Sequence, residues 1–243
     1  MNEIDVREAV AALPELDGND FWSGKRRALR VNIQNEPVSE FLTWPTIIET
    51  MFVGEIGYLS PMRAEMTLTD SFRWEFAIGG GEWGLPTTNL TNQAYHLFQW
   101  ERATGRRVRD MNSIVEIGGG YGALARICHR LGFRGHYTIY DFPELSALQA
   151  YYLARHGLPN VDCRSDFAGG VSADLLVGIF SLVEMPRATL TAYLDGVTAN
   201  HWLIGALAAP WEGDLLHPLI DAKFAAGVKV DSKHLPGRYY LLG

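Results

Sequence analysis

The chain has 243 residues, 47% of them hydrophobic, and a formal net charge of −7. This is enough apolar material for one large domain with a real core, and the acidic balance argues against a nucleic-acid binder, which needs a basic surface. No apolar run approaches the roughly 20 residues of a membrane span, and the first residues lack signal-peptide character, so we expect a cytoplasmic protein without a membrane partner. Cys128 and Cys163 fall in a predicted helix and a predicted strand, which favours free buried thiols.

The first 88 residues predict a mainly helical segment. Apolar residues from Ile4 to Leu13 indicate a short helix that ends near Pro14. The basic cluster 24–30 is more typical of a solvated helix face than of an anion site. A further helix should begin near Pro45 and carry an apolar stripe, which favours core packing or a subunit contact and leaves a homo-oligomer open; the stripe consists of Trp44, Ile47, Ile48, Met51 and Phe52.

Residues 65–69 and 72–76 form short β-like runs, and the stretch 79–86 begins with three consecutive glycines, which is typical of a loop. This loop is either a lid or a linker. A helix from about 91 to 103 should follow, with Ala94, Tyr95 and Phe98 spaced by three or four residues. We place a boundary here, so that residues 1–88 cap the substrate or mediate oligomerisation and residues 89–243 form the cofactor domain.

From residue 113 the predicted elements alternate regularly. Strands at 113–117, 136–141, 160–163, 174–180 and 201–207 are joined by helices at 121–131, 144–156, 186–197 and 217–226; strands 160–163 and 174–180 follow each other directly. Such alternation predicts an α/β fold in which helices cover both faces of a parallel sheet. The last piece, 228–242, reads as two short strands around a turn, so the sheet should end in an antiparallel pair.

A glycine turn follows the first of these strands. Glycines 118–120 and Gly122 separate the apolar run Ile114–Ile117 from a helical segment. Glycine allows positive φ and close approach of a ligand, and the helix N-terminus offers unpaired N–H groups. Asp141, 21 positions after Gly120, ends the next strand, where a carboxylate suits ribose hydroxyls. The turn therefore predicts a nucleotide-type cofactor, although Gly118-x-Gly120-x-x-Ala123 also fits dinucleotides.

Glu116 narrows this prediction, because it gives the pattern Glu-x-Gly-Gly-Gly-x-Gly. This pattern resembles the first motif of class I S-adenosylmethionine (SAM) methyltransferases. The longer series of Ile114–Gly122, Tyr140-Asp-Phe-Pro-Glu-Leu and Ala150-Tyr-Tyr-Leu is similar to the sugar O-methyltransferase family within that class, over roughly residues 89 to 195. The resemblance implies SAM as cofactor and a Rossmann-like methyltransferase sheet with a C-terminal antiparallel hairpin.

The resemblance also implies a set of cofactor contacts. It places the methionine part of SAM on the glycines of the turn, its ammonium group near Glu116 and its ribose on Asp141. Asp166 would contact the adenine with Phe167 close to the ring, although a turn or cap role for Asp166 is equally open. In this class the helix before the first strand borders the cofactor, which makes Asn92, Tyr95 and His96 candidates. The predicted cofactor-binding residues are Glu116, Gly118, Gly120, Gly122, Asp141, Phe142, Asp166, Phe167 and Ser181.

The acceptor side should lie after the strand 174–180, because ligands gather at the carboxyl ends of parallel strands. Ser181 and Glu184 follow that strand. Glu184 is our first candidate for the general base, with an N-cap of the next helix as the alternative; His217 is the second candidate, and His96 is a further one. Glu212, Asp214 and His217 match no metal motif, so we expect no metal.

Amino and nucleobase methyltransferases commonly carry an Asn/Asp-Pro-Pro-aromatic motif after this strand, and this chain lacks it. We therefore expect a SAM-dependent O-methyltransferase that acts on a hydroxyl of a sugar or related polyol in a glycoconjugate or natural product. Its partner would be a small-molecule or glycan acceptor. The alternatives are an NAD-dependent oxidoreductase or epimerase, disfavoured by Glu116 and the terminal hairpin, and a non-catalytic SAM-fold interaction module.

Overall fold

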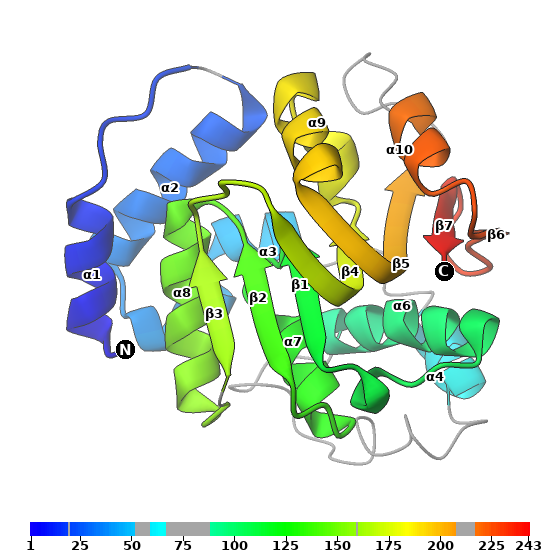
Figure 1. Cartoon of the computed structure of the whole chain (residues 1–243). Helices are drawn as coiled ribbons and strands as arrows, with labels where there is room; N and C mark the ends of the chain where they lie inside the picture. Colours follow the sequence, from blue (N-terminus) through cyan, green and yellow to red (C-terminus); the bar gives the residue numbers. More distant parts are fainter. Residues whose placement is uncertain (19, 52–58, 67–87, 159, 208–216) are drawn as a thin grey trace.

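A computed structural model describes residues 1–18, 20–51, 59–66, 88–158, 160–207 and 217–243 (Figure 1). Its N-terminal part is helical, as predicted. The elements there are α1 (Glu3–Ala11), α2 (Phe21–Asn35), the 3-10 helix η1 (Val38–Thr43), α3 (Pro45–Met51) and α4 (Leu59–Met66). Side-chain caps fix where two of them begin: Asn2 and Asp5 form a capping box at α1, and the Asp20 carboxylate accepts the Ser23 N–H at the start of α2.

Two sequence predictions for this part need correction. The β-like run that starts at Glu65 is wrong for its first two residues, which end α4, because the buried Glu65 carboxylate accepts hydrogen bonds from Arg102 and Tyr95 of the following helix. The apolar stripe also fails at Ile48, which is 41% exposed, whereas Trp44 and Ile47 are buried. Phe52, the run 72–76 and the glycine loop 79–86 lie outside the described residues.

In the described part of the chain, seven strands form one sheet in the order β3-β2-β1-β4-β5-β7-β6. The first five strands are parallel, whereas β7 is antiparallel to both β5 and β6, which confirms the predicted ending. Their bounds are β1 (Ser113–Ile117), β2 (His136–Tyr140), β3 (Val161–Arg164), β4 (Val171–Ile179), β5 (Val197–Leu207), β6 (Val228–Asp231) and β7 (Arg238–Leu242).

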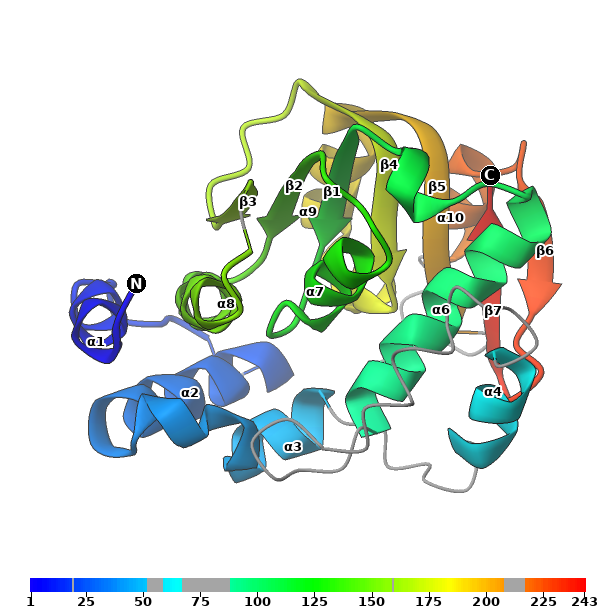
Figure 2. The same cartoon turned by 90° about the horizontal axis from the view of Figure 1, so that it is seen from below.

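Helices cover both faces of this sheet (Figures 1 and 2). One face carries α6 (Thr88–Thr104), α7 (Ala123–Arg130) and α8 (Pro143–Arg155), with the N-terminal helices outside them. The other carries α9 (Arg187–Gly196) and α10 (His217–Lys223). Each face has its own hydrophobic core, and successive side chains of β1 point to opposite faces: Ile114 packs in the first core, under α6 to α8, and Val115 in the second, under α9 and α10. The α/β fold with two covered faces is therefore confirmed, and Cys128 and Cys163 are free.

The strand order places a switch point beside β1. The chain continues from β1 to β2 on one side and later enters β4 on the other, with Glu116 of β1 opposite Val177 of β4. The loops that leave these neighbouring strands diverge at such a point, which opens a place for ligands at the carboxyl edge. Residues 118–122, Asp141 and residues 180–184 all leave the sheet at this edge. No helix in the described ranges is long and apolar enough to cross a membrane.

Candidate functional site

The turn after β1 depends on its glycines. Gly118, Gly120 and Gly122 have φ values of +74°, +60° and +92°, which residues other than glycine rarely adopt. A Cβ at Gly118 would lie 2.3 Å from the Cβ of Ser181, and one at Gly122 would lie 3.2 Å from the Leu153 side chain. Gly122 also occupies the N-cap of α7. The turn is therefore a tight backbone cradle at the beginning of a helix.

Asp141 at the end of β2 reaches this turn. Its Oδ2 accepts hydrogen bonds from the Gly120 N–H at 3.1 Å and from the Gln149 side chain at 2.9 Å, and its Oδ1 accepts the Phe142 N–H at 2.8 Å. Gln149 also donates to the Gly120 carbonyl at 2.8 Å. Burial raises the pKa of Asp141 to about 7, against the opposing effect of these hydrogen bonds. Asp141 and Gln149 together fix the position of Gly120.

Glu116 lies against the turn from within the first core. The side chain is buried, and its Oε2 accepts the Tyr137 hydroxyl at 2.8 Å. A Cβ on Gly119 would lie only 3.0 Å from that oxygen. Burial raises the pKa of Glu116 to about 7, and the charge of Asp141 acts in the same direction. Two poorly solvated carboxylates thus border the glycine turn, and both would gain from a nearby positive charge.

The segment after β4 begins with a strained residue. Phe180 has a φ of 63°, an uncommon conformation for a residue with a side chain, and such strain persists only where the surroundings impose it. Its N–H donates to the Gly205 carbonyl at 3.0 Å, and its ring lies 5.4 Å from that of His96. The Ser181 hydroxyl then donates to the Ile117 carbonyl. The loops after β1 and β4 are therefore tied to each other.

Glu184 ends the 3-10 helix η5 (Ser181–Glu184). The carboxylate accepts a hydrogen bond from the side chain of Trp22, a residue of α2. Burial raises the pKa of Glu184 to about 7, while that hydrogen bond and the charge of Arg238 act in the opposite direction. The alternative prediction that Glu184 caps the next helix is wrong, because Pro186 is the N-cap of α9 and that end has no side-chain cap.

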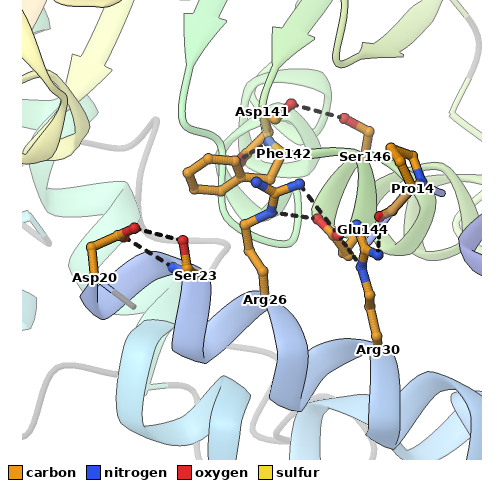
Figure 3. A network of polar contacts seen from close by, with 9 residues as sticks. All are labelled: Pro14, Asp20, Ser23, Arg26, Arg30, Asp141, Phe142, Glu144 and Ser146. Atoms are coloured by element: carbon orange, nitrogen blue, oxygen red, sulfur yellow. Dashed lines mark hydrogen bonds and ion pairs between the residues drawn. The ribbon is translucent and has the colours of Figure 1, made fainter. Parts of the chain in front are cut away.

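Helix α2 lies against the same edge and is held there by buried charge (Figure 3). The guanidinium of Arg26 is 4.7 Å from the centre of the Phe142 ring and 2.9 Å from the Glu144 carboxylate. Arg30 pairs with the other oxygen of Glu144 at 2.6 Å, and Glu144 is fully buried. A solvated basic face was therefore the wrong prediction for these two arginines. The Trp22 ring completes the contact, 5.6 Å from Phe142.

His96 of α6 is fully buried near the end of β4. Its Nδ1 lies 2.8 Å from the Tyr240 hydroxyl, whereas its Nε2 has no hydrogen-bond partner in the part of the chain that the structure describes. Burial lowers the pKa of His96 to about 3, and the charge of Arg238 contributes. A neutral imidazole of such low basicity is a poor proton acceptor at neutral pH, which favours Glu184 over His96 as the base.

The other predicted residues either pair with residues outside this cluster or lie outside the described residues. Asp166 is exposed and pairs with Arg164 at 2.9 Å, and the Phe167 ring packs 4.3 Å from that of Tyr193. His217 begins α10, but its side chain, like Glu212 and Asp214, is outside the described residues. Within the described ranges no group of three histidine, cysteine or acidic residues could hold a metal ion.

Sequence reasoning missed several residues at this edge. Arg26 and Glu144 are separated by 118 positions, and no local pattern predicts their contact. The strain at Phe180 has no sequence signal either, since non-glycine residues with positive φ are not marked by residue type alone. Gln149 was the easiest of these to find, because it lies only eight positions after Asp141, in the predicted helix 144–156 that begins at this edge.

No protein-family model and no curated protein sequence matches this chain. Among solved structures, a SAM-dependent methyltransferase from Aquifex aeolicus is similar at 13% identity and a TM-score of 0.43, over 65% of this chain and 98% of that one. The mitomycin 7-O-methyltransferase MmcR is similar at 13% identity and a TM-score of 0.45, over 92% of this chain and 72% of that one.

A third solved structure is the 16S rRNA N2 G1207 methyltransferase RsmC of T. thermophilus in complex with AdoMet and guanosine. It is similar at 14% identity and a TM-score of 0.45, over 69% of this chain and 44% of that one. With TM-scores below 0.5, these three likenesses assign neither a family nor a reaction to this chain.

Proposed function

We propose that this protein is a SAM-dependent O-methyltransferase that transfers a methyl group to a hydroxyl of a sugar or related polyol. The observation that carries the proposal is the pair of buried carboxylates, Glu116 and Asp141, that border the glycine turn. SAM combines a sulfonium and an ammonium group with one carboxylate, so it is a net cation at neutral pH. A dinucleotide instead brings an anionic pyrophosphate, which the Glu116 carboxylate against the turn would repel, whereas Asp141 alone would suit the ribose of either cofactor.

The remaining cofactor contacts in this proposal follow the same edge. The backbone of Gly118, Gly120 and Gly122 would approach the ligand closely, since all three have positive φ and a Cβ at each would meet a neighbouring side chain at 2.3, 3.0 and 3.2 Å. Asp141 would accept hydrogen bonds from the ribose hydroxyls in addition to those it accepts from Gly120, Phe142 and Gln149, because a carboxylate can accept about four. We retain as further contacts the residues that follow β2, β3 and β4 at this edge: Phe142, Asp166, Phe167 and Ser181.

The protein would supply position and a base for methyl transfer. Bound SAM provides an electrophilic methyl group, and the acceptor oxygen must lose its proton as the new C–O bond forms. Glu184 is our candidate for receiving that proton, with His217 as the second candidate. A carboxylate with a pKa of about 7 is ionised in a large fraction of molecules at neutral pH and is more basic than an ordinary glutamate. Arg238 would stabilise its ionised form.

The N-terminal segment, residues 1–88, would act as the cap over this reaction. Its helix α2 contacts Phe142 on the cofactor side and Glu184 on the acceptor side through one residue, Trp22. The Arg26 and Arg30 pairs with Glu144 hold the helix in that place. Closing the edge with an indole excludes water from the transferred group, which strengthens the electrostatic interactions inside.

Calorimetric titration with SAM and with NADH tests the proposal at its first step. We expect SAM to bind and NADH to show no heat of binding, because the pyrophosphate of NADH would lie against the Glu116 carboxylate, which favours a cation. The acceptor class is then tested with a panel of sugars and polyols, in which methylation is detected by the transfer of a labelled methyl group from SAM. NADH binding without any response to SAM would refute the proposal in favour of an oxidoreductase. SAM binding without transfer to any hydroxyl compound would favour the interaction module.

A further inference from the structure

Helix α6 carries a row of buried polar side chains that the proposed reaction does not use. Asn89, Asn92 and His96 are spaced by three and four residues, so they share one face of the helix. They are 3%, 3% and 0% exposed. In each of them one polar atom has no hydrogen-bond partner among the described residues: Asn89 Oδ1, Asn92 Oδ1 and His96 Nε2. Gln99, three residues after His96 on the same face, also has an Nε2 that is unpaired within the described ranges, but its Oε1 accepts a hydrogen bond from Arg102. Unpaired buried polar atoms are costly and uncommon, and their succession along one face of α6 indicates a missing ligand.

Both ends of this row are fixed at the site described above. Asn89 makes a side-chain hydrogen bond with Tyr121, which lies in the glycine turn. His96 contacts the Tyr240 hydroxyl at 2.8 Å and the strained Phe180 ring at 5.4 Å. Asn92 lies between them, one helical turn from His96. Figure 2 shows α6 beside α7 and across β5 and β7, on the sheet face that carries the first core. The row thus runs from the cofactor turn to the loop that holds Glu184.

We propose that Asn92 and His96 form the recognition surface for the acceptor, which is an uncharged, hydroxyl-bearing molecule. Asn92 Oδ1 and His96 Nε2 would each make one hydrogen bond to a hydroxyl of that molecule. The inference rests on the proposed function and deepens it by naming the chemistry that selects the acceptor. In this arrangement His96 is a positioning residue, while Glu184 receives the proton.

The absence of charge in the row determines the acceptor class. The two asparagines are neutral, and burial keeps His96 in its neutral form. Arg238 and Glu184 have opposite charges, and the charge of Arg238 acts on Glu184. A phosphate, carboxylate or ammonium group would therefore lose its water shell without gaining a counter-charge from this surface. A hydroxyl can both donate and accept, which suits an amide oxygen and an imidazole nitrogen.

The first test needs no acceptor. Asn92→Leu keeps the branched shape and removes the unpaired amide oxygen, so we expect the melting temperature of the ligand-free protein to rise by roughly 2–4 °C. SAM affinity should remain within about twofold of wild type. Thr91→Val is the matched control on the same helix, because the buried Thr91 hydroxyl accepts a hydrogen bond from Arg63 Nε at 3.2 Å and its removal should lower the melting temperature. A fall in Asn92→Leu as large as that in the control would overturn the proposal.

The second test measures the acceptor class. Thermal shifts are recorded with methyl α-D-glucopyranoside, methyl α-D-mannopyranoside and methyl α-L-rhamnopyranoside, and with glucosamine and glucuronate as charged counterparts, on protein saturated with S-adenosylhomocysteine (SAH). At least one neutral glycoside should stabilise the wild type, and Asn92→Leu and His96→Phe should lose that shift while still binding SAH. The charged sugars should give none. Shifts by charged sugars as large as by neutral ones, shifts retained in both variants, or no shift by any neutral glycoside would each overturn the proposal.

Failure of this inference can be told apart from failure of the proposed function. SAH binding to the wild type is measured before any sugar is added, and its absence would refute the methyltransferase proposal. The Asn92→Leu stability measurement needs no cofactor, so it still decides whether the amide belongs to a ligand surface or to the internal hydrogen bonding of the fold.

Discussion

Replacing Asp141 with alanine should weaken SAM binding by a factor on the order of ten to a hundred. The carboxylate makes three hydrogen bonds within the protein, to Gly120, Phe142 and Gln149, and in our proposal further ones to the ribose. A charge-assisted hydrogen bond contributes roughly 1.5 to 3 kcal/mol, and each 1.4 kcal/mol corresponds to about tenfold in affinity. Calorimetric titration with SAM measures the loss directly.

The variant changes two things at once, so it needs a matched control. Asp141→Ala removes the proposed ribose contact and also releases Gly120, whereas Gln149→Leu releases Gly120 from its amide partner but leaves the carboxylate in place. We expect Gln149→Leu to lose less than about tenfold in affinity. Equal losses in the two variants would show that Asp141 acts only by fixing the turn. Wild-type affinity in Asp141→Ala would refute its role altogether.

Three further variants test other parts of the site. Gly120→Val should abolish SAM binding, because φ is +60° and a Cβ would meet the Met51 sulfur at 3.0 Å; Gly24→Ala, where nothing lies within 4 Å, should bind SAM normally in the same titration. Glu184→Gln should slow methyl transfer by a factor of roughly 10² to 10⁴ and leave SAM affinity unchanged. The rate of the wild type should rise with pH through about 7, the pKa of Glu184. An unchanged rate or an unchanged pH profile in the variant would exclude Glu184 as the base. The folded-state pKa of Glu116 is raised from 4.5 to about 7, so its protonation stabilises the ligand-free fold at low pH, and this contribution is lost as pH rises through about 7. Denaturant unfolding of Glu116→Gln should therefore show a smaller loss of stability between pH 5 and 8 than wild type. An equal loss in the two proteins would show that another group titrates in this range.

Local sequence was sufficient for the sheet and for the cofactor side of the site. A strand, a glycine turn and a helix are consecutive in the chain, so their residue types carry the whole signal at Ile114–Gly122. Asp141 was found for the same reason, because the end of the next parallel strand must reach the same edge. The antiparallel ending was predicted from two short strand-like runs, now β6 and β7, that are separated only by a turn.

The closure of the site could not be predicted, because it depends on contacts between distant parts of the chain. The basic cluster of α2 looked solvated, since its partner Glu144 lies on α8 and no spacing rule connects them. Trp22 and Glu184, which are also in contact, are likewise far apart in the sequence. The strain at Phe180 and the polar row of α6 are likewise properties of packing, which residue types alone do not reveal.

The most direct test of the central claim is the number of protons exchanged when SAM binds. Calorimetric titrations at pH 7 in two buffers of different ionisation enthalpy give that number. Because Glu116 and Asp141 each have a pKa of about 7 in the ligand-free protein, part of each population is protonated, and a bound cation should lower both pKa values. We therefore expect SAM to bind with release of protons. Proton uptake on binding, or NADH binding in place of SAM, would contradict it.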